Sequence, residues 1–116
     1  MQPLDLSLAL KAADGDLDLL RDVLEAFLEE YPTLLAELEP ALKAGDSAVV
    51  QRASHTIKGT LRLFGNVPSK ELAERLEEMG ASGSLDDAPK TYEALKQSLE
   101  SLRRSLLDAM KNLEEG

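Results

Sequence analysis

The sequence predicts an all-α fold, an antiparallel four-helix bundle with a short extra N-terminal helix. Leu and Ala supply most of the apolar residues, whereas the aromatic residues that favour strands are reduced to two Phe and two Tyr, with no Trp. Apolar residues recur at steps of three and four along the chain, which is the spacing of a buried stripe on a helix. Short turns separate these stripes, as is typical of antiparallel neighbours in a bundle.

A turn that ends in Asp16 separates the first two elements. A short amphipathic helix is expected around residues 4–13, and Asp16 is suited to cap the helix that follows. The apolar stripe of that second helix consists of Leu17, Leu20, Leu24, Phe27, Leu28, Tyr31, Leu34, Leu35, Leu38 and Leu42. Pro32 and Pro40 interrupt the stripe. Because each proline removes a backbone donor, we expect a kink or a break near residues 31–33.

Glycine and proline mark the ends of the remaining three helices. The third helix is expected over residues 46–65, where the sequence Gly-Asn-Val-Pro stops it. Pro68 then opens a shorter helix that closes at Gly80. Its apolar side is formed by Leu72, Leu76 and Met79. The last helix begins within residues 84–89, and its seam is formed by Tyr92, Leu95, Leu99, Leu102, Leu106, Ala109 and Leu113. Residues 1–116 are expected to form a single domain.

Charge and composition exclude several classes of function. The chain has 13 basic and 22 acidic residues, and the resulting net charge of −9 is the wrong sign for binding nucleic acid or an anionic membrane surface. The absence of cysteine removes disulfides, thiolate metal sites and thiol nucleophiles. With a single histidine we expect no metal site. We further expect a monomer in the cytoplasm, with neither a signal peptide nor a membrane span.

The one histidine, His55, is predicted to face solvent. On a helical wheel of about 100° per residue, the opposite side of its helix holds Ala53, Ile57, Leu61 and Phe64. The residues beside it at helical spacing are Arg52, Lys58, Gly59 and Arg62. No Asp or Glu occurs in residues 47–70, although eleven precede this window and eleven follow it. The pattern predicts a cationic strip on an acidic protein.

Gly59 distinguishes this strip from an ordinary solvated face. A glycine in the interior of a helix costs about 1 kcal/mol relative to alanine, and on an exposed face it fills no gap in the core. The simpler alternative is a solvated helix face that happens to carry one histidine and several cations. The glycine instead favours a site where something needs room beside His55.

The residue types around His55 suit phosphoryl chemistry. A neutral imidazole is a good nucleophile towards phosphorus, and the phosphohistidine that it forms can pass the group to a carboxylate. An ammonium group one turn away, as on Lys58, can hydrogen-bond the phosphoryl oxygens, whereas a carboxylate there would repel them. The window without acidic residues therefore indicates a face that carries a phosphoryl group.

The segment from His55 to Glu77 resembles the signature of the histidine-containing phosphotransfer (HPt) domain. That signature reads His-x-Leu-Lys-Gly-Ser, with a Gly ten residues after the His and a Leu-Glu pair on the next helix. Here the matching residues are His55, Ile57, Lys58, Gly59, Thr60, Gly65, Leu76 and Glu77. Ser54 is a departure, because Ala commonly precedes the acceptor, and we expect its hydroxyl to bond back along the helix.

The resemblance implies a phosphorelay phosphocarrier. His55 is then the acceptor of a phosphoryl group from a receiver-domain aspartate, or from a kinase, and passes it to another receiver aspartate. Lys58 contacts the phosphoryl group, and Gly59 leaves space for the partner. Together with Gly59, the docking residues are Arg52, Arg62 and Leu63, although packing at the core edge is an equal alternative for Leu63. For Glu77 two interpretations stay open, a residue that orients the imidazole or a solvated carboxylate.

The expected partners are response-regulator receiver domains, with a hybrid histidine kinase as a further candidate. The receiver supplies the Mg²⁺, so the chain is expected to bring no cofactor and to be no enzyme. The alternative is a non-phosphorylated adaptor or inhibitor that binds a receiver domain and in which His55 is incidental. The joint presence of His55, Lys58 and Gly59 favours the phosphocarrier. An enzyme that uses His55 as a general base lacks an orienting acid on the same helix face.

Overall fold

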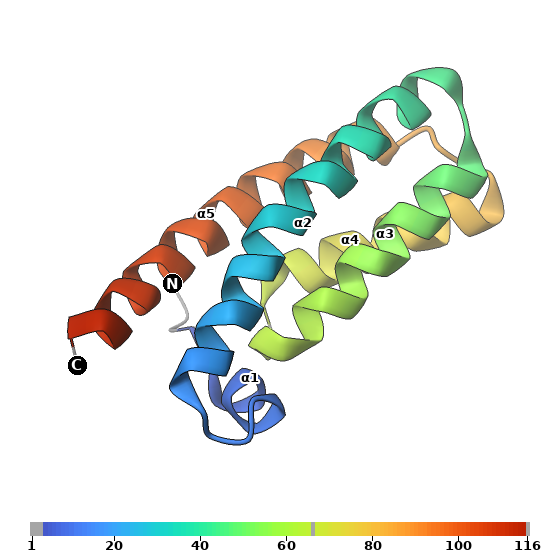
Figure 1. The fold of residues 1–116 in the computed structure, drawn as a ribbon. Coiled ribbons are helices and arrows are strands. Elements are labelled where there is room, and N and C mark those ends of the chain that lie inside the picture. The colour runs from blue at the N-terminus through green and yellow to red at the C-terminus, as the bar shows by residue number, and fades with distance from the viewer. Residues whose placement is uncertain (1–3, 66, 116) are drawn as a thin grey trace.

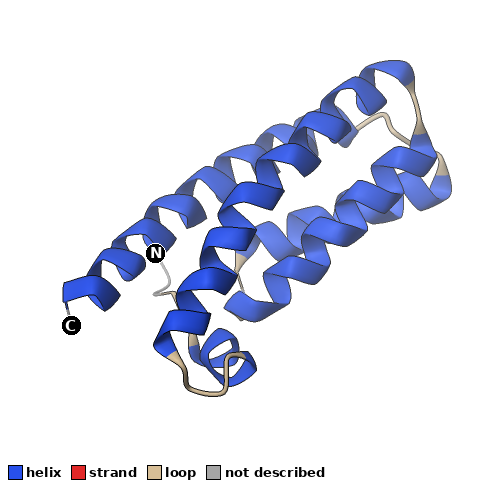
Figure 2. Ribbon diagram, viewed as in Figure 1, coloured by secondary structure: helices blue, strands red, loops and turns tan. Residues whose placement is uncertain are grey.

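In the computed structural model, which describes residues 4–65 and 67–115, every regular element is a helix (Figures 1 and 2). The elements are α1 (Ser7–Ala12), α2 (Leu17–Ala44), α3 (Ser47–Leu61), the 3-10 helix η1 (Arg62–Phe64), α4 (Pro68–Ser82) and α5 (Ala88–Glu115). The predicted all-α class, with four main helices and a short helix before them, is confirmed. None of these helices is both long and apolar enough to cross a membrane.

Helices α2 to α5 form a closed antiparallel ring. Each packs against the next in sequence, and α5 packs against α2 to complete the bundle (Figure 1). The bundle is elongated, with principal extents of 46 × 25 × 21 Å. Helix α1 lies at one end of the bundle, where it contacts η1 and the start of α2. In this arrangement α3 and α4 form a hairpin whose outer surface is open to a partner.

The buried faces of the helices are largely the predicted stripes. The fully or nearly fully buried residues include Leu20, Leu24, Phe27, Tyr31 and Leu38 of α2, Val50, Ala53, Ile57 and Leu61 of α3, Ala73 and Leu76 of α4, and Tyr92, Leu95, Leu99, Leu102 and Leu106 of α5. The ring of Phe27 stacks on Tyr31 at 5.3 Å between centroids and meets the edge of Phe64 at 4.9 Å. Leu17, at the first position of α2, is 52% exposed, so the predicted stripe was wrong there.

Helix α2 continues through both of its prolines. The break expected near residues 31–33 does not occur, and one helix contains Pro32 and Pro40. Both prolines are exposed, so the carbonyl that each leaves without an intrahelical donor lies on the solvent side, where water can bind it. The buried stripe on the other side of α2 packs without interruption.

Aspartate side chains cap the N-termini of α2 and α3. Asp16 caps α2, since its Oδ1 accepts from the backbone N–H groups of Asp18 (2.9 Å) and Leu19 (3.2 Å). Asp46 caps α3 in the same way. Helix α3 ends at Leu61 and passes into η1, a little earlier than predicted.

Helix α4 does not close at Gly80, as the sequence predicts, but continues to Ser82, with Gly83 at φ +76° as its C-cap. Gly80 is instead buried against α3. A Cβ at this position would lie 2.5 Å from the backbone nitrogen of Gln51 and 2.9 Å from the carbonyl oxygen of Ser47. The missing side chain therefore allows the backbones of α3 and α4 to approach closely at this point.

Candidate functional site

His55 projects from the outer surface of α3. Its side chain is 62% exposed, whereas Ala53, Ile57 and Leu61 of the same helix are buried. The helical wheel predicts this orientation. The imidazole is thus held by a rigid helix, with the core on one side and solvent on the other.

A carboxylate from the neighbouring helix joins two residues of this surface. Oε2 of Glu77, on α4, lies 2.6 Å from Nδ1 of His55, and Oε1 lies 2.5 Å from Nζ of Lys58. The side chains of Glu77 and Lys58 are only 18% and 17% exposed. We call His55, Lys58 and Glu77 the triad. Glu77 is therefore not a freely solvated carboxylate, and its contact with Nδ1 matches the other interpretation, a residue that orients the imidazole.

The electrostatics of the triad determine the tautomer of the ring. The pKa of Glu77 is lowered, chiefly by the hydrogen bond from Lys58 and further by that from His55, while partial burial opposes the shift. The carboxylate is therefore ionised near neutral pH and can only accept hydrogen bonds. In the neutral imidazole Nδ1 must then carry the proton and donate it to Glu77. The lone pair lies on Nε2, for which the described residues offer no hydrogen-bond partner.

The surface around His55 is less cationic than the sequence of α3 predicts. The window without acidic residues is real, but Glu77 reaches the surface from α4 and Glu37 from α2, where its carboxylate is 4.0 Å from Arg52. The cationic strip predicted from α3 alone therefore omits the carboxylates that the neighbouring helices bring to this surface. An orienting acid is present, and it comes from the next helix.

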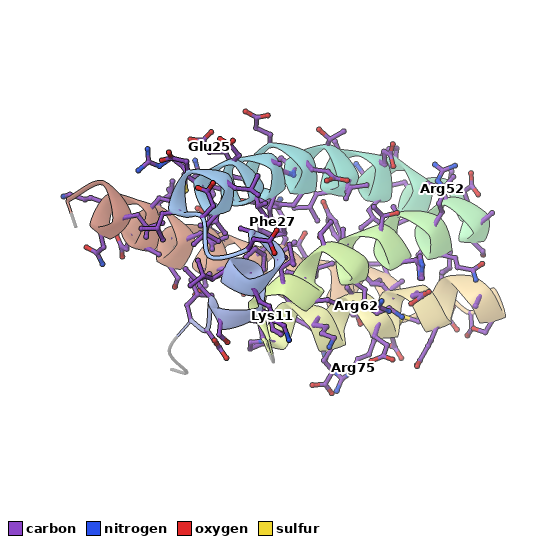
Figure 3. All side chains as sticks on the ribbon, turned by 60° about the horizontal axis from the view of Figure 1, so that its bottom comes forward. Lys11, Glu25, Phe27, Arg52, Arg62 and Arg75 are labelled. Atoms are coloured by element: carbon purple, nitrogen blue, oxygen red, sulfur yellow. The ribbon has the colours of Figure 1, made fainter. Side chains whose placement is uncertain are left out.

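The remaining predicted site residues differ in their surroundings. Gly59 is exposed, and a Cβ there would meet no atom within 4 Å. Arg52 on α3 and Arg62 on η1 are both exposed, and Figure 3 labels the two residues. Leu63 is half-buried and packs against the core. The space expected beside His55 is therefore present, whereas Leu63 has a packing role of its own.

Ser54 departs from the expectation for its hydroxyl. The residue is fully buried, and its Oγ finds no hydrogen-bond partner among the described residues. The bond back along the helix is made instead by Thr56 to the carbonyl of Arg52 (3.0 Å) and by Thr60 to that of Ile57 (2.8 Å). The prediction for Ser54 was wrong, because its enclosed hydroxyl does not reach a backbone carbonyl.

Residues 22–105, well over half of the chain, match the family model described as the Hpt domain. The chain belongs to the Hpt-domain family. Its fold is also similar to the crystal structure of histidine-containing phosphotransfer protein B (HptB) from Pseudomonas aeruginosa PAO1, with 24% sequence identity, a TM-score of 0.85, and coverage of 94% of this chain and 95% of that chain. No curated protein matches the chain.

Membership of the Hpt-domain family makes this bundle a phosphotransfer carrier of two-component relays, in which such domains interact with receiver domains and kinases. The matched range includes all three residues of the triad. Sequence reasoning missed the pairing of Lys58 with Glu77 and the approach of Glu37 to Arg52. The Leu-Glu pair of the HPt signature singled out Glu77, but nothing in the sequence indicates Glu37.

Proposed function

We propose that this chain is a phosphorelay carrier in which Nε2 of His55 accepts a phosphoryl group from a receiver-domain aspartate, or from a kinase, and passes it to another receiver aspartate. The observation that supports this most directly is the 2.6 Å contact between Nδ1 and Glu77 on an exposed helix surface. With Nδ1 engaged, the nucleophilic lone pair is on the outward, accessible nitrogen.

The transfer step balances without any further reactant. The lone pair of Nε2 forms the N–P bond while the bond between phosphorus and the donor aspartate oxygen breaks, and that oxygen leaves with the bonding electrons as a carboxylate. Nδ1 keeps its proton, so the ring gains positive charge, and the adjacent Glu77 carboxylate stabilises that charge. The reverse sequence, with a second receiver aspartate as the nucleophile, regenerates neutral His55.

The other site residues assist the partner in this scheme. Lys58 contacts the phosphoryl oxygens, and the open space at Gly59 allows the receiver to approach the ring closely. Arg52 and Arg62, with the exposed part of Leu63, extend the docking surface. The receiver brings Mg²⁺ with its own aspartates. The chain therefore acts as a reactant that is regenerated, and not as an enzyme.

Label transfer from phosphorylated receiver domains tests this function. Wild-type chain should take up the label in a form that is labile to acid and stable to base, as expected for phosphohistidine. His55→Gln keeps a polar side chain of similar length and should accept none. A chain that binds a receiver tightly but takes up no label from any receiver or kinase is an adaptor, and label that survives acid or persists in His55→Gln excludes His55 as the acceptor.

A further inference from the structure

We infer that the outer face formed by α2 and α5 binds a second copy of this chain. In the ring of four helices this pair lies side by side, opposite the α3–α4 pair that carries the triad (Figure 1). A dimer through this face goes beyond the proposed function, and it differs from the monomer expected from the sequence.

Contacts between α2 and α5 define which residues of the two helices are level. The hydroxyl of Tyr92 on α5 donates to the carbonyl of Leu35 on α2 (3.4 Å). Closer to the start of α2, the charges of Glu100 and Arg103 act on Tyr31 and shift its pKa in opposite directions. Because the helices are antiparallel, the first half of α2 lies beside the second half of α5.

Three leucines lie between these two half-helices. Leu17 and Leu28 precede Leu35 by about five turns and about two turns, so they share its side of α2, towards α5. Leu107 follows Arg103 by one turn and lies towards α2. Leu17 is 52% exposed and Leu107 43% exposed, and Leu28 is only partly buried. We call these three residues the leucine strip. Exposed apolar surface that is rimmed by charges is typical of a protein–protein interface.

Charges of opposite sign flank the leucine strip on the two helices. Asp18 and Glu25 of α2 are exposed, as are Arg104 and Lys111 of α5. Within the described part of the chain none of the four forms an ion pair. Counting from the contacts above, Glu25 is level with Arg104, and Asp18 is level with Lys111. Helix α2 thus presents an acidic pair at the heights where α5 presents a basic pair.

This arrangement makes the face complementary to itself. A two-fold axis that runs along the bundle, over the line between α2 and α5, places α2 of one copy on α5 of the other at an unchanged height. Glu25 then meets Arg104 of the partner subunit, and Asp18 meets Lys111 of the partner subunit. Each of these ion pairs forms twice, and the leucine strips of the two copies lie against each other along the axis.

The small amount of exposed leucine indicates a reversible dimer. Obligate dimers bury large and strongly apolar interfaces, whereas the leucine strip has two exposed leucines and a partly buried one. Association is therefore expected to depend on protein concentration and to weaken in salt, which screens the ion pairs. His55 lies on α3, outside this face, so both imidazoles of the dimer stay open to a receiver.

Sedimentation equilibrium of the full chain at low salt tests the dimer. The mean mass should rise from that of one chain towards that of two between about 1 µM and 1 mM, the range of weak association. Leu107→Asp places a charge in the leucine strip and should leave a monomer throughout. Leu19→Asp is the matched control, because Leu19 is 44% exposed but lies about five turns before Glu37, on the side of α2 towards α3. This variant should associate as the wild type does, and thermal melts verify that both variants are folded.

Charge reversal tests the orientation of the two copies. Glu25→Arg faces Arg104 of the partner subunit, and Arg104→Glu faces Glu25 of the partner subunit. Each variant alone should therefore show a dissociation constant raised by about tenfold or more. A mixture of the two variants restores opposite charges at both contacts and should dimerise like the wild type.

Three results overturn the inference: a wild type that stays monomeric up to about 1 mM, an equal loss of association in Leu107→Asp and Leu19→Asp, or a mixture of the charge-reversal variants that stays monomeric. None of these measurements involves a phosphoryl group. A failed label-transfer experiment would reject the proposed function while the dimer stood, and a monomeric wild type would leave phosphoryl transfer untouched.

Discussion

The hydrogen bond from Nδ1 of His55 to Glu77 determines which ring nitrogen can react. Because Nδ1 is occupied at 2.6 Å and Nε2 is free, the phosphoryl group is expected on Nε2 alone. Phosphorus-31 and nitrogen-15 NMR of the phosphorylated chain distinguish the two isomers. Phosphorylation at Nδ1 would contradict the assigned tautomer and the part given to Glu77.

Two buried serines, which differ in their partners, provide a second prediction. Ser54 has a fully buried Oγ with no partner among the described residues, whereas the Oγ of Ser69, also buried, is 2.6 Å from that of Ser98. An unsatisfied buried hydroxyl costs about 1–3 kcal/mol. Ser54→Ala should therefore raise the free energy of unfolding by about 1 kcal/mol.

Ser69→Ala is the matched control, and it should lower the free energy of unfolding by about 1 kcal/mol because Ser98 loses its partner. Urea unfolding of the two variants beside the wild type measures both effects. A Ser54→Ala variant that is less stable than the wild type would indicate that the hydroxyl has a bonding partner after all.

The sequence predicts which residues of a single helix are exposed or buried, but it does not predict which side chains of two helices are in contact. The exposure of His55 and the open space at Gly59 follow from helical periodicity, which is a property of α3 alone. The bridge from Glu77 to Lys58 depends on the register of α4 against α3. The close contact of Gly80 with the backbone of α3 is part of that packing, and the residues around Gly80 in the sequence do not reveal which residues of α3 it meets.

At the scale of the helices, two glycines in helix interiors have opposite surroundings. A Cβ at Gly59 on α3 meets nothing within 4 Å, whereas one at Gly80 on α4 would lie 2.5 Å from the backbone nitrogen of Gln51. Gly59→Ala should therefore stabilise the fold by up to about 1 kcal/mol through helix propensity. Gly80→Ala should destabilise it by about 2–3 kcal/mol, because α3 and α4 must separate. Thermal and urea melts of both variants test this contrast.

Gly59 should also show opposite results for stability and for transfer. Gly59→Gln has open space for its side chain, so its melting temperature should equal or exceed that of the wild type. The same side chain would occupy the proposed approach of the receiver, and phosphoryl transfer should fall sharply. A variant that transfers at the original rate would leave Gly59 without a functional explanation, and one that unfolds more easily would make it a packing residue.

Helix boundaries were predictable where a local signal decides them. Asp16 caps α2, and Pro68 opens α4, because these residue types satisfy the ends of helices wherever they occur. Gly80 and Pro32 carry the signals of a helix end yet lie within helices. In both cases the helix continues because of its surroundings. Gly80 packs against the backbone of a neighbouring helix, and Pro32 faces solvent. The neighbouring residues in the sequence reveal neither of these surroundings.

For the whole molecule, the triad predicts a pH-dependent part of the stability. The pKa of Glu77 in the folded chain lies below its ordinary value of 4.5, so the unfolded chain binds more protons in this range and stability rises with pH. The stabilisation due to Glu77 should be fully present above pH 4.5 and should be lost as the pH falls through the lowered pKa.

The stability difference between the wild type and Glu77→Gln isolates this contribution. The difference should be constant in alkaline solution, where the imidazole is neutral, and it should shrink in acid as Glu77 itself is protonated, because a protonated Glu resembles Gln. Asp5, whose pKa is lowered mainly by the side-chain hydrogen bond from Ser7, titrates in both proteins and cancels from the difference. A difference that does not change between neutral and acid pH would show that the charge of Glu77 does not contribute to folding. Thermal melts across the pH range provide the measurement.

The ring order of the bundle also bears on how the protein folds. The interfaces α2–α3, α3–α4 and α4–α5 join helices that are consecutive in sequence, and α2–α5 is the long-range interface of the ring. Proteins dominated by local contacts fold fast, since little loop-closure entropy opposes each contact. The α3–α4 hairpin, which contains the whole triad, needs only contacts within residues 47–82. The scaffold of the reactive histidine can therefore assemble early, and the docking of α5 onto α2 is the step that we expect to limit the folding rate.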